Sequence, residues 1–298
     1  MKFRTNTTPN KTTARGTTHV LMLILILIWT VDSITVSKSV SSMNQLFLLG
    51  FKTLCSLPLL LVYTAIREGL KLPSRKDLPA IAAAAFIGDI LYFLFEYTAY
   101  KYLPVGTATI LIGIMPAASY LTDCFRERSA PRPLPLLLII VTIIGMVLVV
   151  YNETGSGSII GYISCFLCIA IWILYGFTAR RLNEHYSSVA ITLYESVIAS
   201  AAMLPFAIML RPSHISAGDI FISIILMGML TSGFGYMIEV RGLIELGNTV
   251  SGIYLNLLPV TTAIAGFIFL RQVMTPVQIL GAFMVIVCGI VLIRLEAA

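Results

Sequence analysis

The chain has 298 residues, of which 58% are hydrophobic and only 11% are charged, and its mean hydropathy is +0.93. A soluble protein of this length needs far more polar surface, so the composition excludes a water-soluble globular domain. The net charge of +6 comes from basic residues scattered between apolar runs, which argues against a nucleic-acid-binding protein.

Ten apolar runs follow one another along the chain, each near the 20 residues that a helix needs to cross a bilayer. We expect all of them to be helical, because a lipid-facing backbone must satisfy its own hydrogen bonds. The predicted fold is therefore an all-α integral membrane protein with ten transmembrane helices. In chain order the predicted spans are residues 20–38, 45–65, 79–100, 104–124, 134–151, 159–179, 187–209, 219–239, 248–269 and 276–294.

Two polar segments flank these spans. Residues 1–19 are rich in threonine and basic residues and predict a disordered cytoplasmic tail. A signal peptide is the alternative, but the apolar run from Val20 continues to about Val36 without an A-x-A-like cleavage site, which favours a retained span. Residues 152–158, NETGSGS, predict a linker between two halves, residues 20–151 and 159–298.

The distribution of Lys and Arg predicts the orientation. With the N-terminus in the cytoplasm, ten spans bring the C-terminus back there, and fifteen of the 20 basic residues fall on cytoplasmic segments. This bias satisfies the positive-inside rule and predicts that both termini are cytoplasmic. The cytoplasmic residues are Lys2, Arg4, Lys11, Arg15, Arg67, Lys71, Arg75, Lys76, Arg126, Arg128, Arg132, Arg180, Arg181, Arg241 and Arg294; the outer ones are Lys38, Lys101, Arg211 and Arg271.

The two halves match when the sequence is shifted by 143 residues without gaps. The shift places Trp29 on Trp172, Lys38 on Arg181, Glu96 on Glu239 and Pro116 on Pro259. Trp, Pro and membrane-buried Glu are rare, so their coincidence indicates an internal repeat. Five spans per half force the second half to enter the membrane from the opposite side. Two inverted five-helix repeats are typical of transporters that bind substrate near the bilayer midplane.

Each half also ends in a block of motifs. In the first half these are AYKYLPVG (99–106), IMPA (114–117) and FRERSAP (125–131); in the second they are GLIELGNT (242–249), LNLLP (255–259) and FLRQVMTP (269–276). Their order and repetition resemble the EamA-like branch of the drug/metabolite transporter superfamily. The resemblance covers roughly residues 20–294. It implies ten helices in two inverted repeats around a central cavity, and transport of small metabolites, amino acids or drugs, often outward.

Six charged residues fall inside predicted spans: Asp32, Lys52, Asp89, Glu96, Glu195 and Glu239. A charge at the centre of a membrane helix costs about 2.5–3.5 kcal/mol on insertion scales, so each should face a cavity or a partner. Asp89 and Glu96 are seven residues apart, hence on one helix face with Tyr92. The inverted repeat suggests an ion pair of Lys52 with Glu96 in the outer half. Snorkelling from span ends is the alternative, above all for Glu239.

Other candidates for the substrate pathway are aromatic or lie beside helix breaks. Trp29, Trp172 and Tyr175 could line a pocket, although Trp and Tyr also collect at membrane interfaces. Pro259 interrupts its span and Asn256 lies one turn before it, an arrangement that suits a binding site; Pro116 does the same in the first half. Lys38, Lys52, Arg181, Glu195 and Glu239 are candidates for gating or structural charges.

We interpret the chain as a secondary transporter of the cell (inner or plasma) membrane that works by alternating access. We expect an exporter of a small molecule, coupled to protons through Asp32 or Asp89, because desolvation favours a neutral carboxyl. An uncoupled facilitator and a non-transporting membrane sensor or assembly subunit remain alternatives. The chain shows no phosphate loop, nucleophile elbow or metal-ligand spacing, and we expect Cys165 and Cys168 to be packing residues. We therefore expect no enzyme, cofactor or metal, and the lipid bilayer as the surrounding partner.

Overall fold

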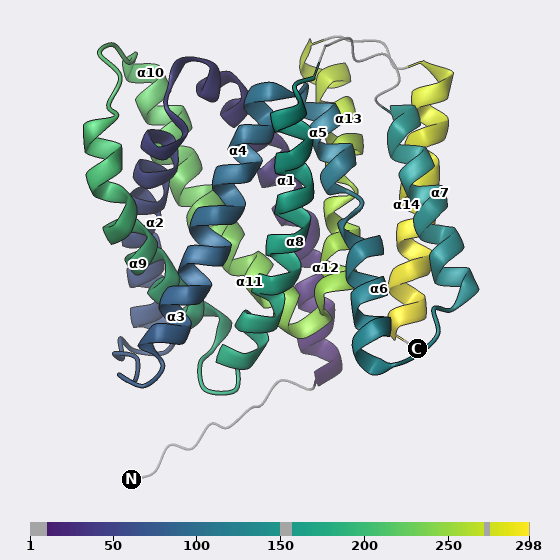
Figure 1. The fold of residues 1–298 in the computed structure, drawn as a ribbon, viewed down its shortest axis with the longest axis horizontal. Coiled ribbons are helices and arrows are strands. Elements are labelled where there is room, and N and C mark those ends of the chain that lie inside the picture. Colours follow the sequence, from purple (N-terminus) through teal and green to yellow (C-terminus); the bar gives the residue numbers. More distant parts are fainter. Residues whose placement is uncertain (1–10, 150–156, 271–274, 298) are drawn as a thin grey trace.

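The computed structural model describes residues 11–149, 157–270 and 275–297, and every regular element in these ranges is a helix (Figure 1). The helices of the first half are α1 (Lys11–Ser42), α2 (Gln45–Arg67), α3 (Leu78–Ala84), the π-helix η1 (Ala85–Tyr92), α4 (Phe93–Tyr102), α5 (Val105–Ile112), α6 (Met115–Glu127) and α7 (Pro133–Val149). Those of the second half are α8 (Ile159–Leu182), α9 (Ser188–Met209), α10 (Ala217–Asp219), the π-helices η2 (Ile220–Leu226) and η3 (Gly228–Gly235), α11 (Tyr236–Leu246), α12 (Asn248–Leu255), α13 (Leu258–Leu270) and α14 (Pro276–Ala297).

The same 143-residue shift that aligns the sequence also aligns the helix boundaries. It carries η1 onto η3, α5 onto α12 and α6 onto α13 from first to last residue, and it carries the start of α2 onto that of α9. Even the breaks coincide: Gly113 lies between α5 and α6, and Asn256 takes its place between α12 and α13. The repeat therefore extends to irregularities of the backbone, which hydropathy alone does not record.

The packing of the helices is reciprocal. α2 packs against its equivalent α9, and α7 packs against its equivalent α14. α1 packs on α11 as α8 packs on α4. In Figure 1 α1 rises from the lower edge to the upper edge, whereas α8 descends. Contacts of this kind arise when two similar bundles face each other across an approximate two-fold axis.

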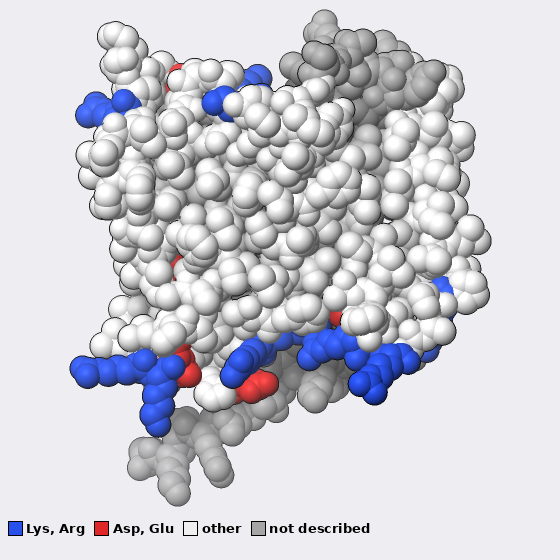
Figure 2. Space-filling model, in the orientation of Figure 1, with Lys and Arg blue, Asp and Glu red and all other residues white. Residues whose placement is uncertain are grey.

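Within the described ranges, seven helices are long and apolar enough to cross a membrane: residues 16–42, 45–67, 78–102, 107–127, 159–182, 188–209 and 217–246. Pro133–Val149 and Pro276–Leu292 are shorter apolar helices. Large side chains such as Leu27 and Phe166 are more than half exposed on the outside of the bundle, where lipid would cover them. Figure 2 shows a broad belt with almost no charge on its surface, with Lys and Arg gathered along the lower edge and fewer along the upper edge.

The start of the chain differs from the predicted tail. α1 begins at Lys11, so residues 11–19 are helical. Two polar side chains of this segment have partners in the second half: the Thr18 hydroxyl donates to Glu245 Oε2, and His19 Nδ1 lies 2.6 Å from Tyr254 Oη. Tertiary contacts therefore extend this helix where composition predicts disorder. Residues 1–10 of the tail and residues 152–156 of the linker lie outside the described residues.

The loops at the lower edge join the two halves. Tyr186, in the loop between α8 and α9, donates to Asp77 Oδ2 at 2.6 Å and accepts from the backbone N–H of Ser74 at 3.0 Å. The hydrogen bond to Asp77 raises the pKa of the Tyr186 hydroxyl. Ser187 donates to Glu68 at 2.6 Å and also caps α9. These contacts hold the loop between α2 and α3 against the loop between α8 and α9.

Candidate functional site

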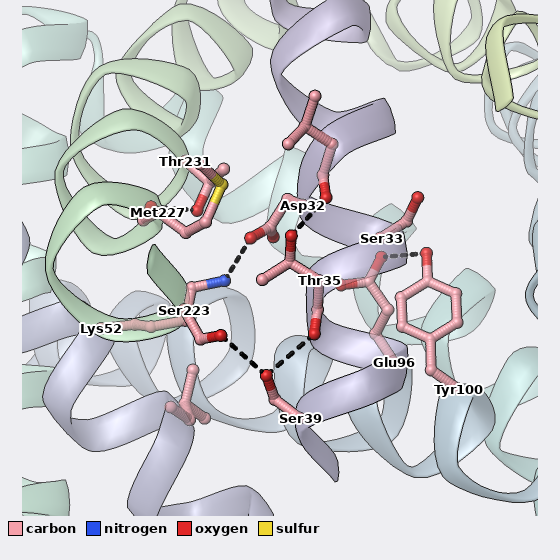
Figure 3. A network of polar contacts seen from close by, with 12 residues as sticks. Asp32, Ser33, Thr35, Ser39, Lys52, Glu96, Tyr100, Ser223, Met227 and Thr231 are labelled. Atoms are coloured by element: carbon pink, nitrogen blue, oxygen red, sulfur yellow. Dashed lines mark hydrogen bonds and ion pairs between the residues drawn. The ribbon is translucent and has the colours of Figure 1, made fainter. Parts of the chain in front are cut away.

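An ion pair lies in the middle of the bundle (Figure 3). Lys52 Nζ, on α2, is 2.6 Å from Asp32 Oδ1 on α1. The Lys52 side chain is fully buried and the Asp32 side chain is 15% exposed. Burying one charge alone would be costly, and the close opposite charge offsets that cost. Lys52 thus pairs with Asp32 rather than with Glu96, the partner that the sequence suggests.

The exposed part of Asp32 borders a small cavity of about 20 Å³, enough for one water molecule. Both halves contribute to its lining: Trp29, Asp32, Ser33, Phe93, Glu96, Tyr97, Tyr100, Thr231, Ser232 and Leu258. Three of these residues, Trp29, Asp32 and Glu96, are among those expected to form the substrate pathway. Lys52 is not itself part of the lining, but its Nζ lies 5.4 Å from the centre of the ring of Tyr97, which is.

Glu96 is held beside the cavity by tyrosines of its own helix turn. Tyr92 and Tyr100, four residues before and after it, donate to Glu96 Oε1 at 3.5 and 3.4 Å. Figure 3 shows the Glu96 carboxyl and the Tyr100 hydroxyl facing each other beside α1. The spacing of four residues places three polar groups on one side of the helix. The site therefore combines an ammonium group, two carboxyl groups and aromatic rings.

Asp89 lies in a different cluster from Glu96. The seven-residue spacing predicts a shared face only for a regular α-helix, but Asp89 lies within the π-helix η1. The wider turns of a π-helix rotate the residues before Tyr92 relative to those after it. Asp89 is buried and interacts electrostatically with Glu195, Tyr175 and Tyr236. Tyr175, on α8, donates to Glu195 Oε2 at 2.8 Å.

Trp172 lies between these two clusters, and Glu239 lies near Glu96 and Tyr92 of the first one. Glu239 is completely buried, so it does not snorkel to a surface as one interpretation of the sequence suggests. Neither of its carboxyl oxygens has a hydrogen-bond partner among the described residues. The Trp172 ring packs against Tyr92 and Tyr175, with centroids 5.0 and 5.3 Å away. Trp172 therefore connects the aromatic walls of the two clusters.

The remaining candidates lie away from the cavity. Asn256 is buried at the break before α13, where its Oδ1 is 3.1 Å from the position that a Cβ on Gly113 would take. Pro116 and Pro259 are the second residues of α6 and α13, directly after the two breaks. Lys38 is exposed near the upper end of α1, and Arg181 is exposed at the lower end of α8.

Several cavity residues were not among the sequence candidates. Tyr97 and Tyr100 are aromatic residues of α4, and Ser33 and Thr231 are small hydroxyl residues. Tyr236, also missed, lies beside Glu195 and not in the lining of the cavity. Tyr100 could have been found from its four-residue spacing to Glu96. Tyr236 could not, because its contact with Glu195 joins α11 to α9. Within the described residues no group of three or more His, Cys, Asp or Glu side chains is arranged to hold a metal ion.

Comparison with known proteins identifies relatives along most of the chain. An uncharacterized transporter of Archaeoglobus fulgidus is 24% identical over 86% of this chain and 90% of its own length. The uncharacterized transporter YyaM of Bacillus subtilis is 25% identical over 76% and 77%. The threonine/homoserine exporter RhtA of Escherichia coli is 20% identical over 71% and 70%.

Similarity of fold extends further. A crystal structure of a protein with 16% sequence identity superposes with a TM-score of 0.73, covering 92% of this chain and 97% of the other. The model of the EamA-like transporter family matches residues 16–151 and again residues 159–295. The family resemblance expected from the motifs is thereby confirmed, with one copy of the domain in each half. This chain belongs to the EamA-like transporter family and is a multi-pass membrane transporter.

Proposed function

We propose that this protein exports a small zwitterionic metabolite, such as an amino acid, by alternating access between two inverted five-helix repeats. The carrying observation is the Asp32–Lys52 ion pair at the edge of the central cavity. A molecule with one ammonium and one carboxylate group can replace each partner of the pair: its carboxylate pairs with Lys52, and its ammonium with Asp32 and Glu96. Replacing the Asp32–Lys52 pair by two ion pairs between protein and substrate leaves no buried charge without a partner.

The aromatic rings around the pair add an apolar contact for the rest of the substrate. Trp29, Phe93 and Tyr97 line the cavity together with Asp32. Rings of this kind favour cations and apolar groups alike. One relative, RhtA, is named as a threonine/homoserine exporter, and this supports both the substrate class and the outward direction for the present chain.

The size of the cavity supports a mechanism that needs motion. A volume of about 20 Å³ holds one water molecule but no metabolite, so this conformation is closed around the site. Movement of the two halves about their shared interface would widen the cavity toward one side at a time. The basic residues at the lower edge support ten spans with both termini in the cytoplasm, under the positive-inside rule.

Proton entry down its gradient is the proposed energy source. The carboxyl groups of Asp89 and Glu195 are buried in the described bundle without a basic partner in an ion pair. A buried carboxyl that binds or releases a proton when the site changes from one side of the membrane to the other can couple proton entry to substrate export. Asp32 is less suited to this role than the sequence suggests, because its charge balances that of Lys52.

The test is counterflow in liposomes that contain the purified protein. A panel of labelled amino acids is compared with metabolites that carry only an ammonium or only a carboxylate group. We expect exchange of zwitterions, and its loss in Asp32→Asn and Lys52→Met. Glu245→Gln is the matched control, because it changes the partly exposed Arg241–Glu245 pair outside the cavity and keeps an oxygen that can accept from Thr18, and it should transport like the wild type. Exchange restricted to molecules with a single charge would refute the proposed substrate class.

A further inference from the structure

The second repeat contains an acidic counterpart of the Asp32–Lys52 pair. The 143-residue shift carries Asp32 onto Tyr175 and Lys52 onto Glu195. The members of each pair are in direct contact: Lys52 Nζ lies 2.6 Å from Asp32 Oδ1, and Tyr175 Oη lies 2.8 Å from Glu195 Oε2. The positive charge of the first pair is therefore replaced by a carboxyl in the second, on the same side of the equivalent helix.

Asp89 adds a second carboxyl to this counterpart. The shift carries Asp89 onto Ser232, which lines the cavity beside Asp32, so Asp89 stands in the equivalent place beside Tyr175. A Cβ added to the neighbouring Gly88 would lie 2.5 Å from the Tyr175 ring and 2.7 Å from Tyr236 Oη. Tyr236 in turn lies within 3.5 Å of Glu195 Oε2. Asp89 also interacts electrostatically with Tyr175, Glu195 and Tyr236, so the four residues form one buried cluster.

Among the described residues no cation balances the two carboxyl groups of this cluster. The polar groups around Asp89 come from three helices: Tyr175 from α8, Glu195 from α9 and Tyr236 from α11. Lys52, on α2, is already bound through its Nζ to Asp32. Arg180, on α8, reaches Asn248 near the lower end of the bundle. Asp89 Oδ2 and Glu195 Oε1 are both buried, and neither has a hydrogen-bond partner within the described chain.

We propose that Asp89 and Glu195 together form the coupling site and share one proton in this conformation. The proposal rests on the proton-coupled export described above. Two buried carboxylates side by side cannot both be ionised without a counter-cation, so one proton takes the place that the Lys52 ammonium has in the first repeat. The Tyr175 and Tyr236 hydroxyls donate to Glu195 Oε2 and hold that carboxyl toward Asp89.

Release of this proton requires water at the cluster. Asp89 lies near the middle of the apolar helix of residues 78–102, whereas Glu195 is seven residues from the lower end of α9 at Ser188. A conformation that opens the bundle toward the lower edge would hydrate Glu195 first. In water both carboxyl groups can be ionised, so the shared proton can leave. The proton would then leave toward the same side from which substrate enters, as export in exchange for protons requires.

One test does not depend on the substrate. The carbonyl stretch of protonated carboxyl groups is recorded by infrared spectroscopy on the purified protein across a pH series. We expect Asp89→Asn and Glu195→Gln each to remove the same titrating component, because the proton belongs to the pair. Tyr175→Phe should shift the pH at which that component disappears, and Glu239→Gln is the control that should leave it in place. An unchanged titration in both pair variants would overturn the proposal.

The second test uses the amino acid that the wild type exchanges best in liposomes. In Asp89→Asn and Glu195→Gln, exchange should persist while accumulation driven by a pH gradient is lost; Glu239→Gln should keep both. If the wild type itself shows no pH-driven accumulation, proton coupling as proposed above fails. If the wild type is coupled and both pair variants stay coupled, only the assignment of the site fails. Accumulation driven by Na⁺ in place of protons would also refute it.

Discussion

Phe93 and Tyr236 occupy equivalent positions in the two repeats, and their rings meet edge to face, with centroids 5.8 Å apart and planes at 70°. A residue can contact its own equivalent only near the axis that relates the two halves. Glu96 and Glu239, a second equivalent pair, interact electrostatically three residues further along the same helices. The cavity, the ion pair and the acidic cluster are therefore arranged around the interface at which the halves would move.

The first prediction concerns the inverted orientation of the halves. In a background without the five native cysteines, single cysteines are placed at four exposed loop or helix-end positions: Lys71, Glu184, Ser41 and Ser213. We expect a membrane-impermeant thiol reagent applied outside intact cells to label positions 41 and 213, and to label 71 and 184 only after the cells are opened. Labelling of 71 and 184 from opposite sides would be incompatible with inverted repeats.

A second prediction concerns the close packing behind the acidic cluster. A Cβ at Gly88 would approach the Tyr175 ring to 2.5 Å, so Gly88→Ala must displace Tyr175 or η1. We expect a loss of about 1–3 kcal/mol in the free energy of unfolding, as for other overpacked cores. Gly16→Ala is the matched control, because a Cβ there meets nothing within 4 Å. Thermal unfolding in detergent measures both; equal midpoints would show that the packing is looser than the structure indicates.

The third prediction concerns the buried ion pair. Removal of one partner, as in Lys52→Met or Asp32→Asn, should cost about 3–5 kcal/mol in stability because the other charge stays buried. The double variant should recover much of that loss, since no lone charge remains. Thermal unfolding of the four proteins gives the coupling energy directly. Additive losses would mean that Lys52 and Asp32 do not depend on each other.

Prediction from sequence succeeded for features that depend on helix length and composition. The apolar runs, the repeat and the two proline-associated breaks are all visible in hydropathy and in rare residues, and the helices occupy the expected ranges. It failed for side-chain partners. Whether Lys52 meets Asp32 or Glu96 depends on how α1, α2 and α4 are rotated about their axes, and hydropathy does not determine rotation.

The separation of Asp89 from Glu96 shows the same limit. Two residues seven apart share a helix face only where the helix keeps its regular α-helical turn, and η1 departs from that turn as far as Tyr92. The helical start of α1 at Lys11 is a second case, because Thr18 and His19 gain partners on α11 and α12 that no local pattern reveals. The equivalence of Asp32 with Tyr175 and of Lys52 with Glu195, by contrast, follows from the shift by 143 residues alone.

A fourth prediction separates the two acidic residues by their access to water. Glu96 lines the cavity, so Glu96→Cys should react with a small water-soluble thiol reagent, and a transported amino acid should slow that reaction. Asp89 lies in the closed cluster with Tyr175 and Glu195, so Asp89→Cys should react far more slowly. Mass spectrometry of the labelled protein measures both rates. Equal labelling would place Asp89 on the cavity after all.

The last prediction concerns Glu239, which differs from its equivalent Glu96 in its surroundings. Glu96 accepts from Tyr92 and Tyr100, but the shift carries those two tyrosines onto Gly235 and Leu243, which have no hydroxyl to offer. Both Glu239 oxygens consequently lack a partner in the described part of the chain. A carboxyl in that position is most stable in its neutral form, and a neutral amide of the same shape replaces it at little cost. Glu239→Gln should therefore unfold at the wild-type temperature or above it and should still transport, whereas Glu96→Gln should impair transport because its carboxyl faces the cavity. Thermal unfolding and counterflow measured on both variants decide the matter: a loss of stability in Glu239→Gln as large as that expected for Lys52→Met would mean that Glu239 is ionised and balanced by a cation.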